Sequence, residues 1–417
     1  MMENNKLLII GKVWPEPASS AAGVRMVQLI GLLKESGFDI TFATSARQTQ
    51  YMLQPDKLGV SSQIIELNNP SFDRFIGDLN PAFVIFDRYM TEEQFGWRVA
   101  ETCPNAIRIL NMEDVHCLRL ARQRAIETGV EFEPKMLLLD ETAFREIASI
   151  YRSDLTLVIS EAEMALLKET FGIPAFLLHY LPLLWDEKPA PKATNPTFED
   201  RQDFVTIGNF RHPPNLDSVF YLKKEIWPLI RKELPEAKLH VYGAYIPQKA
   251  ADLNDKSSGF LIRGRAAEVN QVMEQSRVCL APLRFGAGLK GKIFSALAAD
   301  TPVVATDIGA EGLYKDSEIP GTICLSPKVF ARQAVKLYTD KTYWSTCSET
   351  GKMLIQQRFN RSLFADKFTQ KLHALQVVFT ENREQNFVGS MLQHHSLLSS
   401  RYLSKWIVEK NKKPNQM

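Results

Sequence analysis

The residues best suited to chemistry lie in the stretch 285–313, which reads FGAGLKGKIFSALAADTPVVATDIGAEGL. Gly286 and Gly288 precede a predicted helix, and glycine at such positions lets the backbone approach a ligand closely. The start of a helix attracts phosphate through its unpaired N–H groups and its dipole, and Lys290 and Lys292 add positive charge there. These features favour a cradle for a diphosphate. The alternative is an ordinary strand, loop and helix in which both lysines are solvated.

The same stretch continues with a second glycine loop, which strengthens the cradle interpretation. The predicted helix begins at Leu289, and Ser295 lies three residues after Lys292 on a shared face. A short strand follows, and the loop after it carries Gly309 and Glu311. The sequence therefore places two loops and a helix start at one end of an α/β unit.

A second polar cluster follows a strand predicted over 106–112. Glu113, Asp114, His116 and Arg119 come at the carboxyl end of this strand, the edge where open α/β sheets bind their ligands. His116 and Arg119 are three residues apart and can share a helix face. A single histidine in a loop is more often structural than catalytic, so both interpretations of His116 stay open here.

One further candidate follows the first strand of each half of the chain. Gly23 lies after the strand predicted over 6–10, where backbone N–H groups would face a ligand, or it simply begins a helix. Arg211 follows the strand predicted over 204–207, within the motif GNFRHPPN that begins at Gly208. Its guanidinium could clamp a phosphate with two hydrogen bonds, or the motif could be a surface turn stiffened by its two prolines.

Strands and helices alternate along most of the chain, which predicts α/β domains with parallel sheets. A charged, proline-rich segment without periodicity indicates a linker between two such series. The predicted parts are 1–185, the linker 186–203, the second series 204–360 and a helical end 361–417. In the second series, Asn215 is predicted to cap a helix that runs to about Glu233.

The composition excludes several classes of protein. The chain has 417 residues, 45% of them hydrophobic, enough for two or three domains with their own cores. A net charge of +2 gives no reason to expect nucleic acid as a partner. Five scattered cysteines without a C-x-x-C pair indicate reduced thiols. Because no signal peptide or membrane-spanning stretch is evident, we expect a cytoplasmic protein that contacts a membrane, if at all, from the inner surface.

The C-terminal segment 385–413 carries apolar residues at helical spacing. They are Leu397, Leu398, Tyr402, Leu403, Trp406 and Ile407. This stripe would pack against the body of the protein, or it would lie on a membrane with basic residues meeting anionic lipid. The basic residues are Arg401, Lys405, Lys410, Lys412 and Lys413. The pair His394 and His395 has no further ligand at the right spacing, so we predict no metal site.

The motifs resemble those of GT-B glycosyltransferases of the retaining group called family four, the glycosyl transferases group 1. GNFRHPPN at 208–215, GAGLKGKI at 286–293 and PVVATDIGAEGL at 302–313 have the order and spacing typical of these enzymes. The N-terminal half is similar as well, through EDVHCLR and SDLTLVISEAE. The resemblance extends from about Lys6 to Phe379.

The resemblance implies two Rossmann-like, doubly wound domains that face each other across a cleft, with C-terminal helices crossing back to the first domain. It implies a nucleoside diphosphate sugar as donor, bound by the C-terminal domain, and a glycan or lipid-linked acceptor, bound by the N-terminal one. No metal or other cofactor is implied, because basic side chains and a helix N-terminus neutralise the leaving diphosphate. The implied role is retaining sugar transfer in cell-surface polysaccharide or lipid-linked glycan synthesis.

Matching positions suggest roles for individual residues. Arg211 and Lys292 would contact the diphosphate, and His116 would lie near the transferred sugar or the acceptor hydroxyl. The remaining donor-binding positions are Gly23, Gly208, Gly286, Gly288, Leu289, Lys290, Ser295, Gly309 and Glu311.

Three positions depart from the family pattern. Ser295 replaces a glutamate that usually accepts hydrogen bonds from the donor ribose, and Ala287 occupies the place of another acidic residue. Asp300 stands at a turn where glycine is common, and we expect the turn to persist because aspartate tolerates left-handed backbone. These departures leave two alternatives to sugar transfer open: a nucleotide-sugar epimerase of the same fold, or an inactive binding scaffold.

Overall fold

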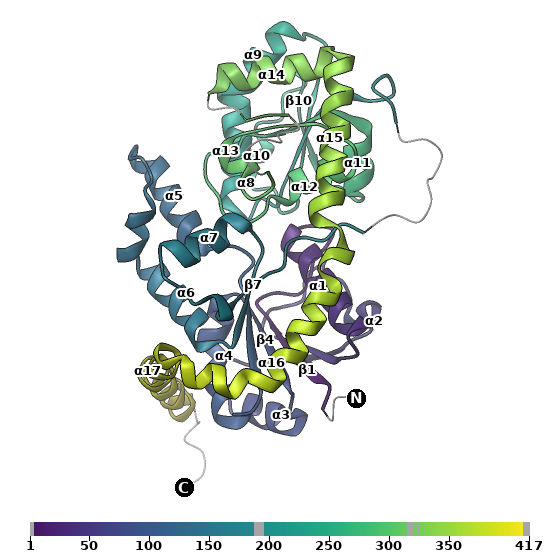
Figure 1. Ribbon diagram of the computed structural model, residues 1–417. Helices are drawn as coiled ribbons and strands as arrows, with labels where there is room; N and C mark the ends of the chain where they lie inside the picture. Colours follow the sequence, from purple (N-terminus) through teal and green to yellow (C-terminus); the bar gives the residue numbers. More distant parts are fainter. Residues whose placement is uncertain (1–3, 187–195, 315–320, 324–325, 412–417) are drawn as a thin grey trace.

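The computed structural model describes residues 4–186, 196–314, 321–323 and 326–411, so residues 187–195 of the predicted linker lie outside it. Two parallel sheets form the two halves of the molecule (Figure 1). The first sheet has the strand order β3-β2-β1-β4-β5-β6-β7 and the second the order β10-β9-β8-β11-β12-β13. Both are doubly wound, with the order reversing beside the first strand of each domain. The predicted pair of Rossmann-like domains is therefore confirmed.

The first domain alternates strand and helix along its whole length. Its strands are β1 (Lys6–Gly11), β2 (Asp39–Thr44), β3 (Ser61–Ile64), β4 (Phe83–Asp87), β5 (Ile107–Asn111), β6 (Leu155–Val158) and β7 (Leu178–Tyr180). Its helices are α1 (Ala21–Glu35), α2 (Pro55–Leu58), α3 (Ser71–Leu79), α4 (Tyr89–Thr102), α5 (His116–Thr128), the short η1 (Pro134–Leu139), α6 (Glu141–Arg152), α7 (Glu161–Glu169) and η2 (Ala175–Leu177). The short strand β7 was not predicted.

The second domain repeats the pattern and is followed by long helices. Its strands are β8 (Gln202–Ile207), β9 (Leu239–Tyr242), β10 (Phe260–Gly264), β11 (Ser276–Ala281), β12 (Val303–Ala305) and β13 (Gly321–Ile323). Its helices are α8 (Pro213–Tyr221), a π-helical turn (Leu222–Ile226), α9 (Trp227–Glu233), α10 (Gln248–Ala251), α11 (Val269–Gln275), α12 (Gly291–Ala298), α13 (Asp307–Ala310) and α14 (Pro327–Thr339). The long helices are α15 (Lys341–Phe359), α16 (Ala365–Gln385) and α17 (Phe387–Asn411), with the 3₁₀ turn η4 (Arg361–Leu363) between the first two.

The C-terminal helices cross back to the first domain, as predicted (Figure 1). Phe368 and Leu372 of α16 are fully buried in one of the two cores of that domain. The crossing lies beside the outgoing linker: Trp185 N–H donates to Phe359 O at 2.7 Å, and Arg361 N–H donates to Trp185 O at 2.9 Å. The two connections between the domains therefore run side by side.

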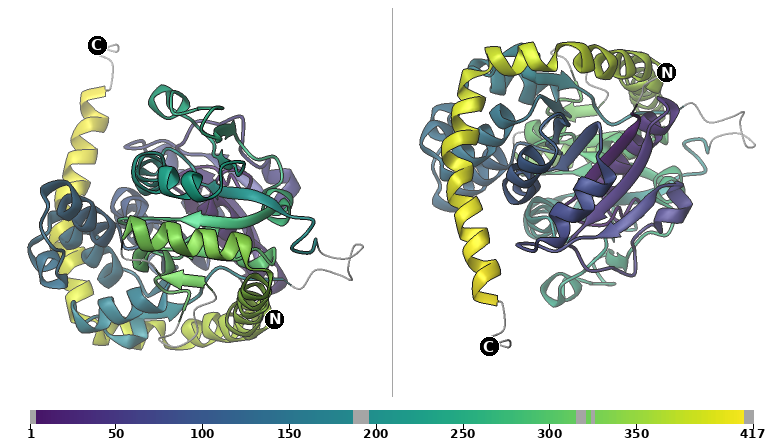
Figure 2. Two further views of the ribbon diagram at one scale, coloured as in Figure 1. Left: turned by 90° about the horizontal axis from the view of Figure 1, so that it is seen from above. Right: turned by 90° about the horizontal axis from the view of Figure 1, so that it is seen from below.

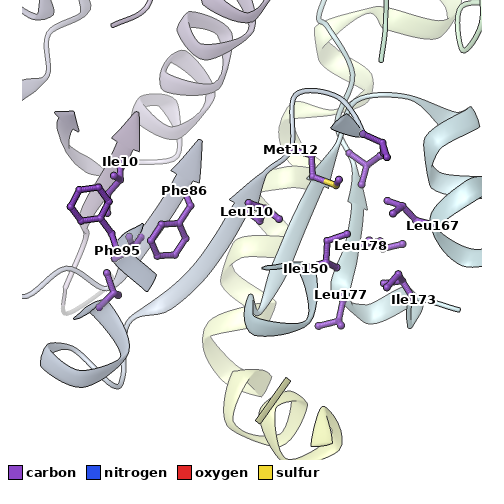
Figure 3. Packing of buried hydrophobic residues seen from close by; sticks show 14 of the residues in the cluster. Ile10, Phe86, Phe95, Leu110, Met112, Ile150, Leu167, Ile173, Leu177 and Leu178 are labelled. Carbon is purple, nitrogen blue, oxygen red and sulfur yellow. The ribbon is translucent and has the colours of Figure 1, made fainter. Parts of the chain in front are cut away.

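Helices cover both faces of the first sheet, so its central strands are buried along their whole length. Figure 3 shows the core on one face, where Phe86 and Leu110 of the strands pack with Phe95 of α4 and Ile150 of α6. All four side chains are 2% exposed or less. This packing fixes the carboxyl ends of β4 and β5, which carry the polar residues of the site.

The structure corrects two local predictions. The helix predicted to start at Asn215 begins at Pro213, because proline at the first helical positions has the required φ and loses no needed donor. The side chain of Asn215 instead donates to Asn209 O at 3.0 Å. The second glycine loop is partly the helix α13, whose first turn is capped by Thr306.

Other local expectations can be followed in the structure. Asp300 has the left-handed φ of +56° that its position was predicted to require. Cys103, Cys117, Cys279 and Cys347 are free thiols, and Cys324 lies outside the described residues. Within the described ranges, no helix is both long and apolar enough to cross a membrane.

The buried ion pair between Glu92 of α4 and Arg152 of α6 generates a stability prediction. Arg152 Nε donates to both carboxylate oxygens, at 2.9 and 3.1 Å, and both side chains are less than 5% exposed. We expect Glu92→Ala to lower the free energy of unfolding by about 3–5 kcal/mol, because it removes the carboxylate that compensates a buried guanidinium. Urea denaturation checks this. The control Glu199→Ala removes an exposed pair with Lys341 and should leave stability nearly unchanged.

Candidate functional site

The two domains contact each other at the carboxyl ends of their strands, through the segments that follow these strands. Two residues of the S-E-A-E motif at the start of α7 reach the second domain. Glu161 accepts a hydrogen bond from Arg358 at 2.6 Å, and Glu163 accepts one from the N–H of Gly288 at 2.8 Å. This is the edge at which open α/β sheets bind ligands, so the candidate site lies between the two domains.

The glycine loop before α12 touches the first domain directly. Gly288 has a φ of +65°, and a β-carbon there would lie 3.0 Å from Asp114 Cβ and 3.2 Å from Glu113 O. A β-carbon at Gly291 would lie 2.4 Å from Ala21 Cβ, so the N-terminal ends of α12 and α1 meet. The predicted close backbone approach is present, but the first domain makes it; a contact of Gly288 with a ligand stays a prediction.

Arg122 of α5 ties two loops of the second domain to the first. It pairs with Glu311 through two hydrogen bonds of 2.7 Å and donates to Gly286 O at 2.9 Å. Lys290 Nζ donates to Gly288 O at 2.7 Å and lies 3.8 Å from the Glu311 carboxylate. Lys290 is 7% exposed, and burial lowers its pKa although Glu311 opposes the shift. Lys290 therefore stiffens the loop as part of an ionic network.

Glu163 connects the loop to the first domain through one carboxylate oxygen. Its Oε1 accepts the N–H groups of Val115 and Gly288, both at 2.8 Å. The other oxygen, Oε2, is buried without a hydrogen-bond partner. Burial and the nearby charge of Asp114 raise the pKa of Glu163 to about 8. A largely protonated Glu163 at neutral pH follows from this environment.

Lys292 differs from Lys290 because nothing neutralises it. The side chain is 9% exposed, and its Nζ is buried without a hydrogen-bond partner. Burial lowers the pKa of Lys292 to about 8, and only the thiol of Cys279 acts against the shift. Lys292 is the second residue of α12, beside amides that the helix leaves unpaired. The alternative with two solvated lysines is therefore wrong, and the charge of Lys292 favours binding of an anion.

Arg211, predicted to act with Lys292, has a different neighbour. It is exposed, and its guanidinium carbon lies 3.6 Å from the ring centroid of Tyr245. The hydroxyl of Tyr245 donates to both carboxylate oxygens of Glu16 in the first domain, at 2.8 and 3.0 Å. In the described part of the chain no ion pair of Arg211 is found. Arg211 thus lies at a second junction between the domains.

The neighbouring His212 shares the electrostatic environment of Lys292. Burial lowers the pKa of His212 to about 4, and the cations Arg119, Arg88 and Lys292 lower it further, against the opposing charge of Asp114. His212 is therefore neutral at pH 7. His212 immediately precedes α8, so the N-terminus of this helix lies beside it.

His116 is held by two carboxylates. Its Nδ1 lies 3.3 Å from Asp114 Oδ1 and 3.4 Å from Glu146 Oε1, and its ring meets that of Tyr89 edge-on at 5.4 Å. Burial lowers the pKa of His116, but the two carboxylates outweigh burial and raise it. Arg119 joins His116 at Asp114, to which its Nε donates at 2.7 Å. The predicted grouping of these residues is thus present around one carboxylate.

Left-handed backbone occurs directly after both strands that lead to this cluster. Arg88 follows β4 with a φ of +71°, and Glu113 lies two residues after β5 with a φ of +67°. Such conformations of residues other than glycine store about 1–3 kcal/mol and concentrate at functional sites. Burial and the charge of Asp87 raise the pKa of Glu113 to about 7, with Arg25 acting against them.

Three predicted glycines have structural reasons to be glycine. A β-carbon at Gly23 would lie 2.4 Å from the backbone of Glu16, and the N–H of Gly23 donates to Ser20 Oγ at 3.0 Å, which caps α1. A β-carbon at Gly208 would lie 2.5 Å from the side chain of Asn215, and one at Gly309 would lie 2.8 Å from a carbonyl oxygen of β11. Their contacts with a donor stay predictions.

The remaining two predicted positions lie on or before α12. Leu289 is buried in the core of the second domain, and Ser295 is half-buried on the helix. Neither has a side-chain hydrogen bond that assigns it a function in the structure.

Sequence reasoning missed Arg122, Glu163, His212 and Tyr245. Arg122 pairs with a residue 189 positions away, Glu163 with one 125 away and Tyr245 with one 229 away, so no local pattern marks them. The available signal was position, since Glu163 and Tyr245 both follow predicted strands at their carboxyl ends. In the described segments no three histidine, cysteine or acidic residues are arranged to hold a metal ion.

Comparison with known sequences finds a family model that matches the second domain. Residues 201–340 match the family model of glycosyl transferases group 1. One curated relative, an uncharacterized 44.6 kDa protein in the cps region of Klebsiella pneumoniae, is 28% identical over 113 residues. That alignment covers 25% of this chain and 29% of the relative, so it spans less than a third of either protein.

Solved structures with the same fold cover nearly the whole chain. Sucrose-phosphate synthase from Thermosynechococcus elongatus superposes with a TM-score of 0.64 at 15% identity, covering 89% of this chain and 99% of its own. HepE from Anabaena, solved with UDP-glucose, superposes with a TM-score of 0.66 at 12% identity, covering 89% of this chain and 100% of its own. The pneumococcal O-GlcNAc transferase GtfA, solved with UDP and GlcNAc, superposes with a TM-score of 0.63 at 11% identity, covering 89% of this chain and 99% of its own. The chain therefore has the GT-B fold.

The buried charge of Lys292 predicts a stability that changes with pH. Its folded pKa of about 8 lies below the ordinary lysine value, so the unfolded chain binds more protons between these two values and native stability rises with pH there. We expect Lys292→Met to raise the free energy of unfolding at pH 7 by up to about 3 kcal/mol, with the gain shrinking toward pH 10. Thermal unfolding of the wild type and of this variant without ligand, repeated at several pH values, measures this difference in stability.

Lys290→Met is the matched control for Lys292→Met. It removes the paired lysine of the same turn, whose hydrogen bond and ion pair offset part of the cost of its burial, so it should stabilise the protein at pH 7 less than Lys292→Met does. A loss of stability in Lys292→Met at pH 7 would contradict the account of an unneutralised charge.

Two substitutions of Glu163 should differ in their effect on stability. Glu163→Gln keeps an acceptor for the N–H groups of Val115 and Gly288, so we expect nearly unchanged stability. Glu163→Leu leaves both buried donors unpaired and should lower stability by about 1–3 kcal/mol for each. Urea denaturation measures the free energy of unfolding of the two variants. Equal values for Glu163→Gln and Glu163→Leu would show that Glu163 does not hold the loop.

Proposed function

We propose that this chain, which has the GT-B fold and whose residues 201–340 belong to the glycosyl transferases group 1, moves a sugar from a nucleoside diphosphate sugar to a hydroxyl acceptor with retention at the anomeric carbon. The donor would bind the second domain and the acceptor the first. Neither a metal ion nor another cofactor would be needed, because the chain supplies the positive charge itself.

The observation that carries the proposal is the unneutralised ammonium of Lys292 at the start of α12. A buried cation without a counter-ion destabilises the free protein. A diphosphate bound at the first turn of α12 would remove that penalty and accept hydrogen bonds from the helix amides. Binding of an anion would also raise the pKa of Lys292 and keep it charged.

The catalytic step requires stabilisation of a leaving group. As the bond between the anomeric carbon and the diphosphate breaks, negative charge grows on the departing oxygens. Lys292 and the amides of α12 would stabilise that charge in a site partly closed to water. Arg211, exposed and stacked on Tyr245, would supply a second cation from the opposite junction.

His116 would contact the transferred sugar or the acceptor hydroxyl. The carboxylates of Asp114 and Glu146 fix its Nδ1, so the other ring nitrogen is left to interact with substrate. Because these carboxylates raise the pKa of His116, it would hold a proton at higher pH than an ordinary histidine. A protonated His116 would donate a hydrogen bond to a sugar hydroxyl.

The comparisons support the substrate class. Structures of the same fold were solved with UDP, UDP-glucose or GlcNAc, which makes a uridine nucleotide the first donor to test. The partial relative from a cps region supports a role in surface polysaccharide or lipid-linked glycan synthesis. The acceptor would then be a growing glycan, free or lipid-linked.

A binding scaffold is the second candidate, and Ser295 is the observation that favours it. In the family pattern a glutamate at this position binds the donor ribose, and a half-buried serine is shorter and uncharged. A scaffold of this kind would bind nucleotide without transferring sugar, or would bind none at all. Calorimetry with UDP and GDP, combined with a transfer assay, separates these cases from an active enzyme.

The proposal predicts the effect of removing the charge at position 292. Lys292→Ala should lower kcat/KM by about 100- to 1,000-fold, as expected when one transition-state donor is lost, while the protein stays folded. Transfer assays with UDP-sugars and GDP-sugars, run with and without EDTA, measure this, and EDTA should have no effect. Lys249→Ala, at an exposed lysine of the same domain, is the control and should keep full activity.

Two results would contradict this assignment. Full activity of Lys292→Ala would show that Lys292 does not act on the donor. Unfolding of the variant would make Lys292 structural, and Lys292→Met, expected to be stable, would then carry the activity test.

A further inference from the structure

The C-terminal helix α17 packs on the first domain through small and polar residues. A β-carbon at Gly389 would lie 2.2 Å from Tyr151 O, so the backbones of α17 and α6 meet closely there. Fifteen residues later, Ser404 is 3% exposed and accepts a hydrogen bond from Arg98 of α4 at 2.9 Å. Three members of the stripe predicted to pack against the body, Tyr402, Leu403 and Trp406, are not on this packing face.

Large apolar side chains of α17 are exposed instead. They are Phe387 (74%), Val388 (39%), Met391 (43%), Tyr402 (65%), Leu403 (58%) and Trp406 (58%). At about 100° per residue, these six lie within an arc of about 160°, and Gly389 and Ser404 lie outside it on the other side. The six exposed residues form two groups, one toward each end of α17, and the outermost residues of this exposed stripe lie about 30 Å apart along the helix axis. Of the predicted stripe, Leu398 and Ile407 are half-buried, and the side chain of Leu397 lies outside the described residues.

This arrangement is the reverse of that of an ordinary surface helix. A helix that only completes a globular fold turns its apolar side inward and its polar side to water. Two groups of exposed apolar residues on one side of a helix, 387–391 and 402–406, instead mark a contact with another partner. The exposed stripe therefore needs an occupant.

The charges near the stripe favour a lipid surface with negative charge. In the described residues 401–411 of α17, three residues are basic and one, Glu409, is acidic. Lys410 Nζ lies 4.9 Å from the ring of Trp406, at the edge of the stripe. Arg401 and Lys405 lie 2.8 and 3.9 Å from the carboxylate of Glu101, so this cluster keeps a net positive charge. Aromatic and aliphatic residues on one side with basic residues at the margin are typical of interfacial helices.

The shape of the helix supports the same occupant. Figure 2 shows α17 as a long, straight helix along the outside of the molecule in two views. A straight helix can bring both groups of exposed residues to one flat bilayer surface. A second copy of the chain would have to bring a complementary groove to the same narrow stripe.

We propose that α17 is an interfacial helix that binds the protein to the surface of an anionic lipid bilayer. Phe387, Met391, Tyr402, Leu403 and Trp406 insert between lipid headgroups, and Arg401, Lys405 and Lys410 contact the anionic phosphates. The helix lies in the plane of the membrane surface and does not cross it. The inference does not rest on the proposed sugar transfer, because it uses contacts of α17 alone.

Vesicle flotation of the full-length protein tests the proposal. We expect the protein to float with vesicles that contain about one-third phosphatidylglycerol, and at least about tenfold less with pure phosphatidylcholine vesicles. The double variant Leu403→Glu with Trp406→Glu should lower partitioning into anionic vesicles at least about tenfold. Raising the salt concentration should weaken binding of the wild type.

Val377→Glu is the matched control, because Val377 on α16 is 81% exposed but lies outside the stripe. It should float like the wild type, and circular dichroism and melting temperature should show that both variants are folded. Two results would overturn the proposal: no flotation of the wild type, or equal flotation of the double variant. A dimer that the double variant converts to monomer, without lipid binding by the wild type, would assign the stripe to a second copy.

Discussion

The arrangement of the site depends on the hydrogen bond between the N–H of Gly288 and the carboxyl of Glu163. It joins the glycine loop of the second domain to the helix α7 of the first. The left-handed backbone of Gly288 points its N–H toward α7 and lets residues 113 and 114 approach from the first domain. Together with the hydrogen bonds of Arg122 to Gly286 and Glu311, this contact fixes the loop that leads into α12 relative to His116 and its carboxylates.

Charge is distributed unevenly around that contact. Lys290 and Arg122 share Glu311, and Arg119 and His116 share Asp114, so most charges at the junction already have partners. Lys292 is the exception, with a buried Nζ that no acceptor meets. The paired charges keep the loops rigid, and the unpaired one leaves the site ready for an anion.

Much of the fold could be predicted from the sequence. The residues 83–87 form the predicted strand β4 because every one of them is buried under helices on both faces. The prediction of a helix start near Lys292 also holds, because glycine and lysine patterns are local. The partners of Arg122 and Glu163 could not be predicted, because each depends on how two domains meet. For the same reason the burial of Lys290 and Lys292, which decides their chemistry, appears only in the folded chain.

The paired backbone hydrogen bonds at Trp185 have a consequence for motion. The chain leaves the first domain and returns to it at one place, where Trp185 is bonded to Phe359 and Arg361. Two connections at a single location act as a hinge, so the easiest relative movement of the domains is rotation about that point. In such a rotation a junction moves in proportion to its distance from the pivot. Opening would then separate the remote contacts furthest, while the covalent connections hardly shift.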